Sequence, residues 1–223
     1  MNIILIGPQA SGKGTMAQRI EEEFGWPQIS MGKLLRKEAG KNTKEGKWIG
    51  KLINSGIIVP SRLTTKILLG RLEKKDCIKG FQLDGYPRNI DNFRELKRYL
   101  AKKGETIGLV FFLRLSKKTA IRRLGSRIQC KKCERIYNTI TLKPKRRGVC
   151  DRCGEKLIQR VDDRPKAIAK RFKLFRKQTM PIIKLLKKEY KIAEINAEVN
   201  VEKEYTQIRK TIKSALHASG AFT

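Results

Sequence analysis

The chain has 223 residues, of which 39% are hydrophobic and 33% charged, and its formal net charge is +31. This composition excludes a disordered or fibrous chain and predicts a soluble globular protein, with one domain carrying insertions or two small domains. No apolar run approaches the ~18 residues of a membrane-spanning helix and no signal peptide is recognisable, so we expect a cytoplasmic protein without a membrane partner.

Apolar runs and helical periodicity alternate along the chain. The run NIILI at 2–6 predicts a strand buried on both faces, and further strands are predicted at 81–83, 109–115 and 191–196. Helices are predicted at 16–24, 62–75, 89–103, 165–190 (with a bend at Pro181) and 199–216. This alternation predicts an α/β fold with a parallel sheet covered by helices.

The first predicted strand leads into GPQASGKGT, Gly7 to Thr15. Glycines let the backbone fold around an anion, the following helix presents its positive N-terminal end, and Lys13 adds a mobile positive charge. Because the loop follows a buried strand and opens a helix, the pattern indicates nucleotide binding rather than a chance glycine-rich turn.

Two Cys-x-x-Cys pairs stand outside the strand and helix rhythm, as an insertion before the long predicted helix: Cys130, Cys133, Cys150 and Cys153. Four thiolates fill a tetrahedral zinc shell and leave no position for water or substrate, so the spacing predicts structural zinc. A disulfide pair or unpaired thiols are the alternatives. Cys77 stands alone and is expected to be partly buried and without a functional role.

Taken together, the motifs resemble the adenylate kinases, within the nucleoside monophosphate kinases, in the form whose long lid carries zinc. The resemblance covers nearly the whole chain, through GPQASGKGT, PQISMGKLLR, LDGYPRN, RLGSR, the cysteine segment and LIQRVDDRP. It implies a three-layer P-loop fold around a parallel five-stranded sheet. The implied divisions are a core at 1–29, 60–121 and 160–223, a helical NMP-binding insertion at 30–59, and a zinc lid at 122–159. The implied reaction is reversible phosphoryl transfer from MgATP to AMP, and because one compact chain suffices for both substrates, we expect a monomer.

The resemblance also implies roles for individual residues. The residues expected to act in catalysis are Lys13, Asp84, Arg88, Arg127, Arg160 and Arg171. Those expected to bind ATP are Gly7, Gly12, Lys13, Gly14, Thr15, Arg123 and Arg127. Those expected to bind AMP are Ser30, Met31, Arg36, Val59, Gly85, Arg88, Asn92, Arg160 and Arg171. Thr15 and Asp84 are expected to place magnesium, and Asp162 and Asp163 to act at the lid hinge and orient arginines.

The sequence departs from the family pattern in three regions. Met31 and Lys33 replace the usual threonine and aspartate near Arg36, and Ala10 and Ser11 stand where the phosphate loop usually has a second glycine. The glutamine that reads adenine falls where this chain has Asn92, as in the UMP/CMP kinases. A pyrimidine monophosphate kinase is therefore an alternative, although the long cysteine-bearing lid favours AMP.

The high positive charge leaves a third, more remote reading open, a zinc protein that binds nucleic acid. The basic residues are scattered over nearly every predicted helix, without interleaved aromatic residues for base stacking. We therefore do not expect specific nucleic-acid binding.

Overall fold

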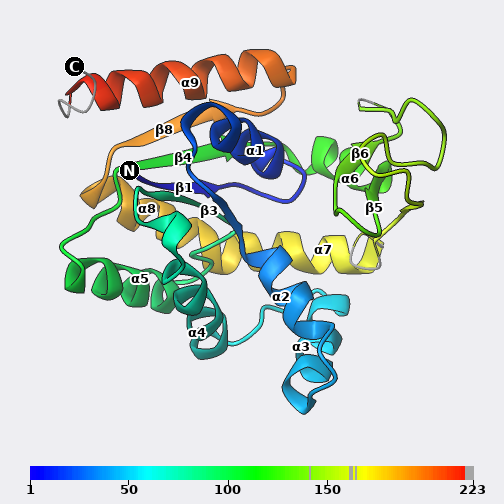
Figure 1. Cartoon of the computed structure of the whole chain (residues 1–223), viewed down its shortest axis with the longest axis horizontal. Coiled ribbons are helices and arrows are strands. Elements are labelled where there is room, and N and C mark those ends of the chain that lie inside the picture. The colour runs from blue at the N-terminus through cyan, green and yellow to red at the C-terminus, as the bar shows by residue number, and fades with distance from the viewer. Residues whose placement is uncertain (141, 161–162, 164, 219–223) are drawn as a thin grey trace.

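The structure, a computed structural model, describes residues 1–140, 142–160, 163 and 165–218. Its centre is a sheet of five parallel strands in the order β2-β3-β1-β4-β8 (Figure 1). The strands are β1 (Asn2–Ile6), β2 (Gln28–Ser30), β3 (Phe81–Asp84), β4 (Leu109–Arg114) and β8 (Ile192–Asn196). The predicted α/β fold with a parallel five-stranded sheet is confirmed. Edge strand β2 was not among the strands predicted from the sequence, because three residues are too few to show a periodicity.

Side chains of β1 alternate between two apolar cores, which makes the molecule three-layered. Ile3 and Leu5 pack against helices α1 (Lys13–Phe24) and α9 (Val201–Ala218). Ile4 and Ile6 face the other side, where α4 (Ser61–Leu72), α5 (Ile90–Lys102) and α8 (Met180–Glu189) cover the sheet. Figure 1 shows α1 and α9 on one side of the sheet and α5 and α8 on the other.

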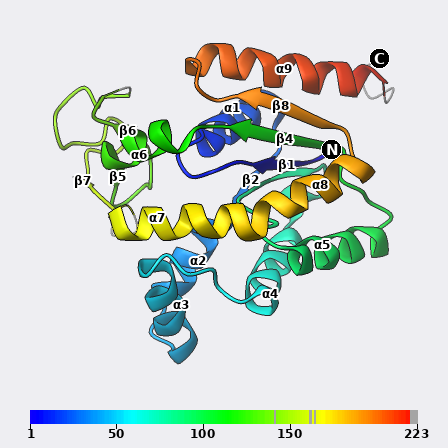
Figure 2. The ribbon, with the colours of Figure 1, turned by 180° about the vertical axis from the view of Figure 1, so that it is seen from behind.

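The single long helix predicted at 165–190 is interrupted in the structure. It consists of α7 (Pro165–Leu174), a π-helical turn (Phe175–Thr179) and α8. Pro181 has no N–H to donate and its ring crowds the carbonyl four residues earlier, so the widened turn replaces the simple bend that was predicted. Figure 2 shows α7 running beneath the central sheet toward α8.

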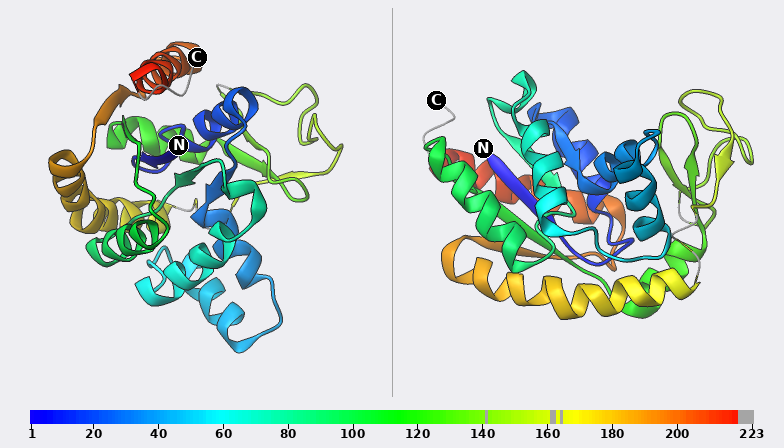
Figure 3. Two further views of the ribbon diagram at one scale, coloured as in Figure 1. Left: turned by 60° about the vertical axis from the view of Figure 1, so that its left-hand side comes forward. Right: turned by 90° about the horizontal axis from the view of Figure 1, so that it is seen from below.

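Two insertions project from the three layers (Figure 3). The first consists of the helices α2 (Met31–Ala39) and α3 (Lys44–Asn54). The second follows α6 (Lys117–Gly125) and is an antiparallel sheet in the order β6-β5-β7. Its strands are β5 (Arg127–Cys130), β6 (Ile136–Asn138) and β7 (Leu157–Ile158). The predicted domain boundaries, 30–59 and 122–159 among them, stay predictions. Within the described ranges, no helix is long and apolar enough to cross a membrane.

Candidate active site

The loop between β1 and α1 is shaped by residues with little or no side chain. A β-carbon on Gly7 would lie 2.6 Å from both the Leu113 carbonyl oxygen and the Ser11 hydroxyl oxygen, so this position requires glycine. Gly12 (φ 87°) and Ala10 (φ 59°) are both left-handed, a conformation that costs a non-glycine residue about 1–2 kcal/mol. Among the residues that the structure describes, no side chain caps the start of α1, so its first N–H groups remain available to an anion.

Lys13 lies across this loop. Its Nζ donates hydrogen bonds to the Gly7 carbonyl (2.9 Å), the Pro8 carbonyl (2.7 Å) and the Ser11 hydroxyl (3.3 Å). Burial lowers the pKa of Lys13 to about 8, and Asp84 opposes that shift. Arg88, Arg171 and Arg127 lower the same pKa further, which places all three guanidinium groups within electrostatic reach of the ammonium. The structure therefore assembles a cationic site at the phosphate loop.

The carboxyl edge of the sheet supplies Asp84, Gly85 and Arg88. Asp84 ends β3 beside Leu5 of β1, and its Oδ2 would lie 3.8 Å from a β-carbon on Gly14 in the loop. Gly85 is left-handed (φ 76°), and its carbonyl accepts a 2.9 Å hydrogen bond from Arg88 Nε. This edge is where open parallel sheets bind ligands.

Asp163 joins two of the predicted catalytic arginines. Its carboxylate has no exposed area and accepts hydrogen bonds from Arg127 Nε (2.7 Å) and Arg127 Nη2, and Arg171 Nη1 lies 3.7 Å away. The pairs connect β5, α7 and the segment between them. Asp162 lies outside the described residues.

Arg123, on α6, reaches the phosphate loop from the other side. Its Nη1 donates a 3.2 Å hydrogen bond to the Ala10 carbonyl. Thr15 lies in the first turn of α1, two residues after Lys13. All the residues predicted to bind ATP are therefore in the loop, in the start of α1, or at the junction of α6 and β5.

A cleft between the two insertions contains two more predicted site residues. Arg36 and Arg160 line it together with Asn54, Gln129 and Glu134. Across it, Arg36 Nε and Glu134 Oε1 form an ion pair at 3.2 Å. Glu134 has a left-handed backbone (φ 56°), and neither this residue nor its contact was predicted.

The remaining residues predicted to bind AMP lie deeper. Met31 and Val59 are buried in the apolar core, and Ser30 precedes α2, so their part in AMP binding stays a prediction. Asn92 is 2% exposed and donates to the Thr64 hydroxyl at 3.2 Å, while its Oδ1 accepts from the Arg88 N–H at 3.3 Å. The Asn92 amide is thus engaged within the protein. Lys33, the departure noted in the sequence, is exposed.

The four paired cysteines converge in the lid. Their sulfur atoms all lie within 4.8 Å of one another, with Cys130–Cys153 at 3.4 Å and Cys133–Cys150 at 3.5 Å. These separations exclude disulfide bonds of about 2.05 Å. They suit a tetrahedron with zinc–sulfur bonds of about 2.3 Å, whose edges are about 3.8 Å. The donor set therefore fits zinc.

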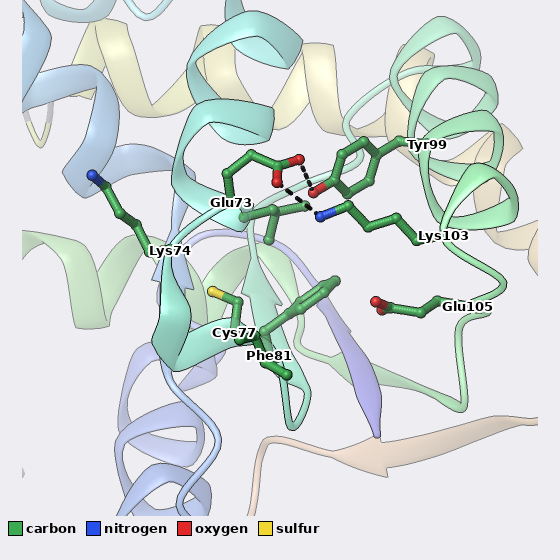
Figure 4. Close-up of a pocket in the computed structure, with 9 residues that line it drawn as sticks. Glu73, Lys74, Cys77, Phe81, Tyr99, Lys103 and Glu105 are labelled. Atoms are coloured by element: carbon green, nitrogen blue, oxygen red, sulfur yellow. Dashed lines mark hydrogen bonds and ion pairs between the residues drawn. The ribbon is translucent and has the colours of Figure 1, made fainter.

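A second pocket lies away from this site. Figure 4 shows it between α4 and α5, with the Cys77 thiol inside and Glu73 hydrogen-bonded to Tyr99 (2.7 Å) and Lys103 (2.9 Å) at its rim. Phe81, the first residue of β3, also lines it. The pocket is therefore at the amino edge of the sheet, opposite the edge where parallel sheets bind ligands, and contains none of the predicted site residues.

A buried carboxylate beside the phosphate loop was not among the site residues predicted from the sequence. Glu204 of α9 is 2% exposed and lies against Gly12. Its position four residues before Ile208 and eight before Ile212 puts it on the buried stripe of the helix, and this spacing was the signal that could have found it.

Comparison with known proteins identifies the family. The family model described as adenylate kinase matches residues 5–191. An adenylate kinase of Thermoanaerobacter sp. is 39% identical over 212 residues, covering 95% of this chain and 98% of the relative. Adenylate kinases of Caldanaerobacter subterraneus (95% of this chain and 96% of the relative) and Fervidobacterium nodosum (91% and 93%) are each 37% identical. The chain that builds this cationic loop, arginine cluster and four-cysteine lid belongs to the adenylate kinase family.

Proposed function

We propose that this chain catalyses the reversible transfer of the terminal phosphoryl group of MgATP to AMP, giving two ADP. The observation that carries the proposal is the set of charges around Lys13, where Asp84, Arg88, Arg127 and Arg171 all act on one ammonium group. Phosphoryl transfer requires two phosphates to be aligned and their negative charge to be neutralised, and it needs no protein nucleophile. The cations gathered at this site could supply that neutralisation.

On the donor side, the loop amides and the open start of α1 would hold the ATP phosphates. Lys13 would exchange its three loop acceptors for phosphate oxygens, and Arg123 would lie against the donor nucleotide. Thr15 and Asp84 would hold magnesium, which neutralises phosphate charge when it is bound with ATP.

On the acceptor side, Arg36, Arg88, Arg160 and Arg171 would clamp the AMP phosphate. An oxygen of that phosphate attacks the terminal phosphorus of ATP, the bond from this phosphorus to its bridging oxygen breaks, and the remaining donor leaves as ADP. Asp163 keeps Arg127 and Arg171 oriented toward the moving group.

The lid would exclude water, because water in the site would hydrolyse ATP instead. Structural zinc on the four cysteines would fix the lid's fold and take no part in the reaction, since four thiolates leave no open coordination position. A monomeric state and a cytoplasmic location stay predictions.

A coupled assay of zinc-loaded protein with MgATP and AMP, CMP, UMP or GMP tests the proposal. We expect AMP to be the fastest acceptor. Arg88→Ala should lower turnover by orders of magnitude, whereas Arg94→Ala, at an exposed position of the same region, should leave it unchanged. Faster turnover with CMP or UMP would show that a pyrimidine monophosphate, and not AMP, is the preferred acceptor. No turnover with any acceptor would overturn the proposal.

A further inference from the structure

Glu204 brings a carboxylate to the inner side of the phosphate loop. A β-carbon built on Gly12 would lie 3.2 Å from each of its carboxylate oxygens, so the absence of a side chain at Gly12 makes room for it. Its Oε1 is buried and has no hydrogen-bond partner within the part of the chain that the structure describes. A buried carboxylate oxygen without such a partner is costly, and nothing in the proposed reaction uses Glu204.

The charges that face Glu204 come from two elements. Burial raises the pKa of Glu204 to about 7, while Arg123 of α6 and Lys13 of α1 oppose the shift. The nearest acid on its own helix, Glu202, is exposed and pairs with Arg19 instead. The protonation of Glu204 is therefore balanced between desolvation and two cations that belong to the predicted donor site.

We propose that Glu204 is a proton-accepting group of the donor site, which takes up a proton when the nucleotide phosphates bind to the loop. The inference rests on the proposed binding of ATP to this loop. Bound phosphates add negative charge beside Gly12 and draw Lys13 and Arg123 into new contacts, and both changes disfavour a carboxylate whose Oε1 has no hydrogen-bond donor among the described residues. Protonation makes the carboxyl neutral and removes the repulsion.

Because binding raises the pKa of Glu204, ATP binds more tightly to the protonated form, and its affinity falls as pH rises through 7. One net charge about 10 Å away, at an effective dielectric constant of about 20, raises a carboxyl pKa by about 1. A carboxyl half-protonated at pH 7 would then gain about 0.4 proton for each ATP bound.

Calorimetric titration of MgATP at pH 7, without acceptor, measures this uptake when repeated in buffers of different ionisation enthalpy. We expect about 0.4–0.5 proton per ATP in the wild type and about 0.1 in Glu204→Gln, the remainder coming from Lys13. Glu202→Gln removes an exposed acid from the same helix and should keep the wild-type value.

A second measurement needs no variant. In infrared difference spectra of the wild type, MgATP should increase the C=O stretch of a protonated carboxyl group, and absence of this band would overturn the inference. Equal proton uptake in the wild type and Glu204→Gln would also overturn it while leaving ATP binding intact. Failure of MgATP to bind to the wild type would instead overturn the proposed function, and this inference with it.

Discussion

Replacing Asp163 by asparagine tests how the arginine cluster is held together. The change keeps the shape of a fully buried side chain but removes the charge shared by Arg127 and Arg171. Breaking a buried ion pair by removing one partner costs about 3–5 kcal/mol. Because both arginines retain some exposure, we expect about 3 kcal/mol, which lowers the melting temperature by roughly 6–12 °C for a chain of this size.

Glu194 supplies a matched control. It also lies between two cations, Arg114 (3.3 Å) and Lys187 (2.5 Å), but on the surface. Exposed pairs are worth about 0.2–1 kcal/mol, so Glu194→Gln should lower the free energy of unfolding by less than about 1 kcal/mol.

Urea unfolding and steady-state kinetics on the two variants decide the matter. Asp163→Asn should lower kcat/KM by about 100-fold, mainly through kcat, because a misplaced guanidinium group fails in the transition state. Glu194→Gln should leave kcat unchanged. The reasoning is refuted if the two variants lose the same stability, or if Asp163→Asn keeps the wild-type kcat.

Three further outcomes are expected. Glu134→Gly should be more stable than Glu134→Gln by about 0.5–1 kcal/mol in thermal unfolding. Both changes remove the ion pair with Arg36, but only glycine relieves the left-handed backbone, which Gly154 adopts at the equivalent position of the second cysteine pair (φ 70°). Zinc removal by a chelator should unfold the lid and abolish transfer, and Cys150→Ser should bind less than one zinc per chain by metal analysis; full activity of metal-free protein would contradict this. The kcat/KM for ATP should fall above pH 8 as Lys13 loses its proton, since burial lowers its pKa to about 8, and the fall should persist in Glu204→Gln; a flat profile to pH 9.5 would be inconsistent with the buried lysine.

Much of the fold was predictable because its signals are local. The buried run of β1 and the phosphate loop lie next to each other in sequence, and α1 begins at Lys13 directly after the loop. The edge strand β2 was not predictable in this way, because its identity depends on pairing Ile29 with Leu83 of β3 rather than on its own three residues. The π-helical turn likewise depends on tertiary context, since Thr179 in it donates to the Arg88 carbonyl at 3.0 Å.

The residues of the candidate site also differ in how far local sequence predicts them. Asp84 ends a buried strand and Arg88 follows it, so sequence reasoning places both at the ligand-binding edge without help from a relative. The pairing of Arg127 with Arg171 through Asp163 spans 44 positions and was expected only from the family resemblance. Glu134 and Glu204 were not expected, because their significance depends on which distant element packs against them.

The surplus of basic residues explains why these few carboxylates matter. The chain has 52 lysines and arginines against 21 acidic residues, so cations gathered around one loop repel each other with little compensation nearby. Asp163 is placed between two of the guanidinium groups, Asp84 acts on Lys13, and Glu204 faces Lys13 and Arg123. Each buried or partly buried acid therefore stabilises a cation to which the proposed reaction assigns a role. In the proposed complex, the bound phosphates take over the stabilisation of these cations. Glu204 then shares Lys13 and Arg123 with the nucleotide, so we expect its carboxylate to take up a proton.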